Sequence, residues 1–152
     1  MRKFVVMGFL LFLALSSLQA QTVAVKSEEQ EINFVSRKGL STTIELDKKT
    51  VQKAWIAALR NWGRVDSPKK SIYWLKDTEI KPIADEAITL MSRVEESEKG
   101  TTVFCALEIG GEYIEQGTRD YYAAHNFLDD FAVNLYRQDL NEQIEEVDDV
   151  LE

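Results

Sequence analysis

Several residue types are scarce in this chain of 152 residues, and each shortage excludes something. A single cysteine, Cys105, excludes an internal disulfide framework, so burial of apolar side chains has to hold the fold together. No proline or glycine follows Gly117, so nothing interrupts a helix over Asp120–Glu152. The longest apolar run, Phe4–Leu15, falls short of the ~20 residues that a membrane-spanning helix needs.

The first twenty residues are typical of a secretory signal peptide. A basic start precedes the apolar run, and small residues end at Ala20, where we expect cleavage. Without this segment the chain carries 16 basic and 26 acidic residues, a net charge of −10. Such a charge disfavours nucleic acids and anionic membrane surfaces as partners. We therefore expect a periplasmic or secreted protein with no stable membrane insertion after cleavage.

Three further segments follow the signal peptide. We read residues 21–38 as a polar leader, either flexible or an edge strand, 39–136 as one α+β domain, and 137–152 as an acidic helical tail. Within the domain, Leu40–Leu46 alternates with period two and predicts a strand. Asp47 is a suitable N-cap for a helix that ends near Gly63.

Three more strands are expected before the last helix. They are Ile72–Leu75, Ala87–Glu95 and Thr101–Ile109, with loops at 64–71 and 76–86 and a glycine-marked bulge at Gly110–Gly111. The order β-α-β-β-β-α predicts a four-stranded, mostly antiparallel sheet with both helices on one face. The core under the helices is expected to contain alternate residues of the last two strands, namely Ile88, Leu90, Val94, Val103, Cys105, Leu107 and Ile109.

The last helix carries two apolar stripes on nearly opposite sides, at ~100° per residue. The first stripe is expected to cover the core and consists of Tyr121, Ala124, Leu128, Phe131 and Leu135. The second is expected to meet a partner and includes Val133, Tyr136, Leu140, Ile144, Val147 and Leu151. Leu140 onward steps by four, three and four, the spacing of a coiled-coil seam. From Asp139 there are seven acids and no base, so the seam indicates either a partner helix, preferably a basic one, or a solitary tail that frays.

Two sequence segments resemble those of small exported proteins of Bacteroidetes-type bacteria. They are Thr-Val-Phe-Cys-Ala-Leu-Glu-Ile-Gly-Gly-Glu-Tyr-Ile at 102–114 and Phe-Leu-Asp-Asp-Phe-Ala-Val at 127–133, together with the strand–helix order. The resemblance covers residues 39–152 and implies an α+β domain that runs into a C-terminal coiled coil. It implies no activity and no site residues.

Catalytic and metal chemistry find little support in the sequence. His125 is the only histidine and has Asp129 one turn later on the last helix, but no serine, cysteine or second histidine is placed to complete a catalytic triad. Cys105 alternates in phase with the buried face and is expected to be core. The carboxylate pairs of the last helix lack the looped backbone that a hard cation needs. We therefore expect no catalytic, cofactor-binding or metal-binding residues.

Two functions remain open. The first is a non-enzymatic exported module that associates, with a protein partner or with itself, through the last helix. The alternative is a protein that binds a small apolar ligand, either in a cavity under that helix or on the other sheet face. That face is expected to be open and to display Trp74, Met91 and Phe104. If the leader at residues 21–38 covers this sheet face, the face cannot be the ligand site.

Overall fold

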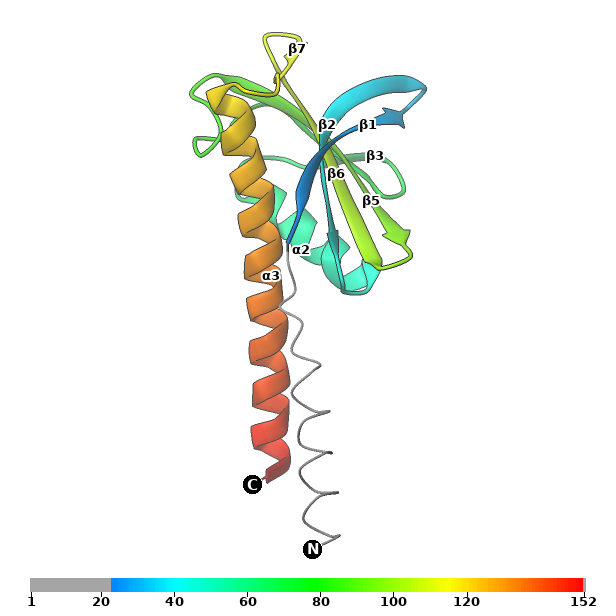
Figure 1. Cartoon of the computed structure of the whole chain (residues 1–152), viewed down its shortest axis with the longest axis vertical. Coiled ribbons are helices and arrows are strands. Elements are labelled where there is room, and N and C mark those ends of the chain that lie inside the picture. Colours follow the sequence, from blue (N-terminus) through cyan, green and yellow to red (C-terminus); the bar gives the residue numbers. More distant parts are fainter. Residues whose placement is uncertain (1–22, 152) are drawn as a thin grey trace, which may run out of the picture.

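The computed structural model describes residues 23–151, so the expected signal segment lies outside the described residues (Figure 1). One antiparallel sheet has the strand order β1-β2-β6-β5-β4-β3, with the short β7 paired to β6. The strands are β1 (Val25–Ile32), β2 (Val35–Ile44), β3 (Asp66–Lys69), β4 (Ile72–Glu79), β5 (Ala87–Ser97), β6 (Gly100–Ile109) and β7 (Glu112–Tyr113). The helices are α2 (Lys48–Arg60) and α3 (Arg119–Leu151).

The predicted α+β class, antiparallel sheet and long C-terminal helix are confirmed, but the strand count of four is wrong. The leader forms an edge strand, β1, whose mostly exposed, charged side chains hide the period-two pattern. The sequence predicts a loop where the structure has β3, because β3 contains Pro68. The proline is tolerated in this strand because β3 forms the other edge of the sheet, where one side of the strand needs no hydrogen-bonded neighbour. Gly110 and Gly111, with φ of 62° and 84°, form the β6–β7 turn and not a bulge.

α2 begins as its sequence predicts. The Asp47 carboxylate accepts hydrogen bonds from the Thr50 hydroxyl (2.6 Å) and the Thr50 backbone N–H (3.0 Å), which lower the pKa of Asp47. The predicted stop at Gly63 is wrong, because α2 ends at Arg60 with Asn61 as a right-handed cap.

The main core lies between one face of the sheet and the two helices. The strand residues expected there are buried, except that Ile109 is only partly covered. Trp55 of α2 is completely buried, and its indole N–H donates to the Ser92 hydroxyl (2.8 Å). Its ring also meets Phe131 of α3 edge to face, at 4.9 Å between centroids. This tryptophan therefore links the sheet, α2 and α3.

The other sheet face is covered by the β1–β2 hairpin, so the expectation of an open apolar face is wrong. β2 pairs with β6 only from Leu40 to Ile44, and the outer half of the hairpin bends over the sheet. Ile32 at its tip packs in a second cluster with Ile72, Phe104 and Ala106. Phe104 is only 1% exposed and Met91 only 4%. The polar sequence of the leader concealed this cover, since Ile32 is the one fully buried side chain among its described residues, 23–38.

Gly39 lies where the hairpin leaves the sheet. A Cβ at this position would overlap the Cys105 carbonyl oxygen and lie 2.8 Å from Cζ of Phe104. Since the clash includes backbone, it cannot be relieved by a side-chain rotation.

Gly39→Ala is therefore expected to lower the free energy of unfolding by about 2–3 kcal/mol, measured by urea denaturation. Gly110→Ala is the control, because no atom lies within 4 Å of its Cβ and only its φ of 62° opposes alanine. That change should cost about 1 kcal/mol. Equal losses in the two variants would contradict the close approach at Gly39.

Candidate functional site

The C-terminal part of α3 extends beyond the sheet and α2 (Figure 1). Every residue from Leu140 to Leu151 is exposed. We call four of these residues the tail seam; their exposed fractions are Leu140 57%, Ile144 51%, Val147 58% and Leu151 78%. Their spacing places them on one side of the helix, so the seam is a continuous apolar strip with nothing over it among the described residues.

Tyr136 differs from the other predicted partner contacts. It is half-buried against the main core, and its hydroxyl accepts a hydrogen bond from the Glu45 backbone N–H at 2.7 Å. Asp139 is the last half-buried residue of α3. Tyr136 therefore anchors the helix on the body, and the free surface begins at Leu140.

The tail remains helical although its acids oppose the helix dipole at the C-terminal end. Side-chain hydrogen bonds one turn apart support it, from Gln138 to Glu142 (3.1 Å) and from Gln143 to Asp139 (2.7 Å). The salt bridges found among residues 23–151 include none to the tail acids. The tail thus carries negative charge that no salt bridge of the described chain neutralises. At ~100° per residue Asp148 lies beside the seam, whereas Glu142, Glu145, Glu146 and Asp149 lie toward the opposite side of the helix.

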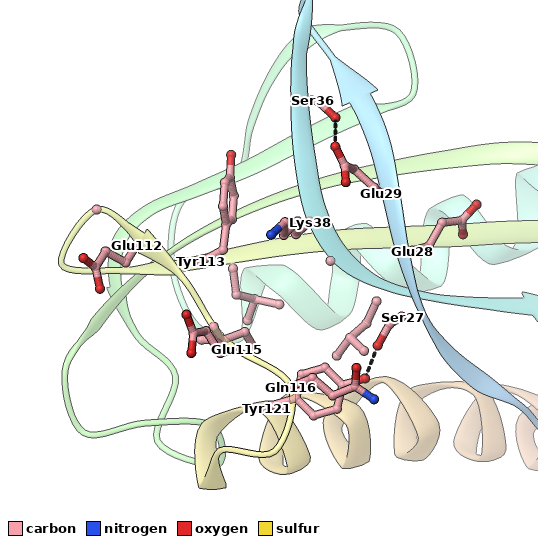
Figure 2. Close-up of a pocket in the computed structure, with 15 residues that line it drawn as sticks. Ser27, Glu28, Glu29, Ser36, Lys38, Glu112, Tyr113, Glu115, Gln116 and Tyr121 are labelled. Atoms are coloured by element: carbon pink, nitrogen blue, oxygen red, sulfur yellow. Dashed lines mark hydrogen bonds between the residues drawn. The ribbon is translucent and has the colours of Figure 1, made fainter.

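A groove of about 810 Å³ opens at the other end of α3 (Figure 2). We call it the β1–β7 groove, because the bend of the β1–β2 hairpin separates that hairpin from β7 and from the start of α3. Leu40, Leu107, Ile114 and Tyr121 supply its apolar part. Its polar residues are Ser27, Glu28, Glu29, Ser36, Lys38, Glu112, Glu115 and Gln116.

The walls of this groove are tied together by hydrogen bonds. The hydroxyls of Ser27 and Tyr121 join β1 to α3, and Ser36 donates to Glu29 across the hairpin (Figure 2). Arg37, whose side chain is 12% exposed, donates to the Tyr113 hydroxyl (3.1 Å) and pairs with Glu108 (3.5 Å). The groove is therefore a built concavity, although no motif in the sequence marks its residues.

A second depression, of about 480 Å³, lies between α2 and α3. Its apolar lining includes Ala54, Ala58, Trp62, Phe127, Phe131 and Leu135. It lies beside the last helix, whereas the sequence suggested a cavity beneath it.

The three residues predicted to form a ligand face do not form one. Met91 and Phe104 are buried, and Trp74 is half-buried with the Lys76 ammonium 5.0 Å from its ring centroid. The Trp74 indole N–H has no hydrogen-bond partner among the described residues. Phe104 borders only a cavity of about 180 Å³, whose other lining residues are polar or charged.

No catalytic arrangement emerges among residues 23–151. His125 and Asp129 are both half-buried, and no hydrogen bond or ion pair of this part of the chain joins them. No group of three or more metal-ligating side chains is found in the described region. Within the same region, no helix is long and apolar enough to cross a membrane.

Cys105 is 1% exposed, and its burial raises the pKa of the thiol to about 12. Because the thiolate is the reactive form, iodoacetamide at pH 8 should leave the folded protein unmodified and label it fully in denaturant. Mass spectrometry gives the labelled fraction. Stoichiometric labelling of the folded protein, with an unchanged circular dichroism spectrum, would contradict the burial of Cys105.

Comparison with known proteins adds no relative from which a function could be transferred: no protein-family model, curated protein or solved structure matches this chain.

Proposed function

We propose that the protein is an exported, non-enzymatic interaction module that docks a basic helical surface of a protein partner on the C-terminal part of α3. The observation that carries this proposal is the tail seam, Leu140, Ile144, Val147 and Leu151, exposed on a helix beyond the body. The basic and apolar start of the sequence supports export.

The seam supplies the apolar part of the interaction. Covering a half-exposed Leu, Ile or Val gains about 1 kcal/mol, and the spacing of four, three and four presents the residues to a single helix. Much of that gain offsets the entropy lost on association. The seam therefore favours a partner that also supplies charge complementarity.

The acids specify the sign of that charge. Two tails paired with each other from Asp139 onward would bring fourteen acids into one bundle without a base, which is unfavourable at ordinary salt. A helix with lysine or arginine beside its apolar residues relieves this repulsion. The partner surface is therefore basic and apolar, and tail-to-tail pairing is disfavoured.

A designed heptad peptide with isoleucine at the seam positions and lysine beside them tests this interaction. Fluorescence anisotropy should show binding that weakens with salt. Leu140→Ser combined with Ile144→Ser should raise the dissociation constant about tenfold or more, because two of the four seam contacts are lost.

Tyr122→Ser is the matched control, since Tyr122 is 58% exposed on the same helix but lies outside the tail. Its affinity for the peptide should equal that of the unchanged protein. A chain ended after Gln138 keeps Tyr136 on the body and should not bind. Equal binding by the truncated and full-length chains would refute the docking function.

A second candidate function, binding of a small apolar ligand, is favoured by the volume of the β1–β7 groove. An environment-sensitive dye such as anilinonaphthalene sulfonate should brighten with the native protein. Ile114→Trp, which fills the groove from its half-buried wall, should reduce that signal several-fold.

The Leu140→Ser/Ile144→Ser variant serves as the control here and should keep the dye signal. If the seam variant loses the signal and Ile114→Trp retains it, the dye reports on the tail and the groove proposal fails.

A further inference from the structure

The depression between α2 and α3, which we call the α2–α3 groove, has an apolar lining that is held in place. Half-buried side chains of both helices and of the residue after α2 form this lining, namely Ala54, Ala58, Trp62, Phe127 and Phe131. The rings of Phe127 and Phe131 meet the buried Trp55 ring edge to face, at 6.4 and 4.9 Å between centroids. The groove of about 480 Å³ is therefore a preformed apolar surface that is still partly open to solvent.

The α3 side of this groove continues directly into acids of the tail. Phe127, Phe131, Leu135, Gln138, Glu142, Glu145 and Asp149 follow one another at steps of four, four, three, four, three and four residues. At ~100° per residue these side chains lie within roughly 50° of one direction around α3. The Gln138 amide, which lines the end of the groove, donates a hydrogen bond to the Glu142 carboxylate (3.1 Å). We call these seven residues the groove row.

The acidic half of the groove row lies beyond α2, where α3 extends past the body (Figure 1). Glu142, Glu145 and Asp149 are exposed, and no salt bridge among residues 23–151 involves them. Arg137, the last base of α3, points roughly 110° away from the row. One side of α3 is thus apolar beside α2 and negatively charged farther along.

A single helix laid along the groove row would meet both halves. Phe127 to Asp149 spans 22 residues, which is about 33 Å of helix. Bulky apolar side chains of that helix would lose contact with water in the groove, which supplies most of the affinity. Lysine or arginine side chains would face the acids and fix the position of the helix along the row.

The dipole of α3 also selects the direction of this helix. The acids lie toward the C-terminal, negative end of α3, where the positive N-terminal end of another helix is favoured. The bases of the partner helix therefore precede its apolar residues. Neither helix that the structure describes has this pattern, since α2 buries its apolar residues in the core and α3 is acidic.

We infer that the α2–α3 groove and the groove row form a second docking site, which takes an antiparallel helix of another protein with bases followed by bulky apolar residues. This site goes beyond the docking function proposed above. The tail seam points roughly 160° away from the groove row, so one helix cannot contact both surfaces.

A dye-labelled helical peptide, with lysines in its first turns and leucines at every third or fourth position after them, tests this inference. Fluorescence anisotropy should show binding that weakens with salt. Glu142→Gln with Glu145→Gln and Asp149→Asn should raise the dissociation constant about tenfold and remove most of the salt dependence. Ala58→Trp, which fills the groove, should also raise it about tenfold or more.

Glu86→Gln with Glu96→Gln and Glu98→Gln is the matched control, because these acids are exposed outside α3 and the charge change is the same. This variant should bind the peptide as the unchanged protein does. The Leu140→Ser/Ile144→Ser variant should also bind it unchanged, since the seam is on the other side of α3. Thermal melting of every variant checks that the fold is kept.

Binding that survives both Ala58→Trp and the loss of the tail acids would overturn the inference. If the seam variant alone loses the peptide, docking on the seam stands and the second site is wrong. If the seam variant keeps this peptide while the seam-directed peptide fails to bind the unchanged protein, the second site stands and the seam function is wrong. An unchanged protein that is dimeric by light scattering, and monomeric with Ala58→Trp, would assign the groove to a second copy and overturn the inference.

Discussion

The packing of one stripe of α3 on the sheet is the contact on which the rest of the structure depends. Tyr121, Ala124, Leu128, Ala132 and Leu135 are buried there, and Trp55 links this layer to α2 and, through Ser92, to the sheet. Because α3 is one uninterrupted helix, the packing of its first half also fixes the direction of its second half. Because the sheet ends before the helix does, the residues after Asp139 extend into solvent, and the tail seam is exposed as a consequence (Figure 1).

A second constraint is the close approach at Gly39. The hairpin leaves β6 at this glycine and bends toward the second sheet face, where Ile32 covers Phe104. The same bend leaves the opposite side of the hairpin uncovered, and that space is the β1–β7 groove. The close approach of Gly39 to Cys105 thus goes with two features of the fold. The sheet face that the sequence predicted as a ligand site is covered, and the β1–β7 groove, which the sequence did not predict, is open.

The two helices have opposite charge, and neither balances the other within the molecule. α2 is basic on its exposed side, and the tail of α3 is acidic. Like charges gathered on one surface repel each other unless water, salt or an oppositely charged partner screens them. Any association through these surfaces should therefore depend on ionic strength. The fold keeps the two surfaces apart, since α2 packs on the sheet and the tail extends beyond it.

The sequence alone determined the elements with strong periodicity. The strand before Asp47, the N-cap of α2, the central strands and most of the core-facing stripe of α3 were predicted, because local burial patterns and capping specify them. Within that stripe the predicted Phe131 is half-buried, and Ala132 is buried instead. Tertiary structure decided the rest. β1 and β3 are edge strands whose side chains mostly face water, and the Gly39 bend, the covered Phe104 and the anchored Tyr136 depend on contacts between distant residues. A periodic pattern reports which side of an element is buried, whereas only the assembled fold shows what covers it.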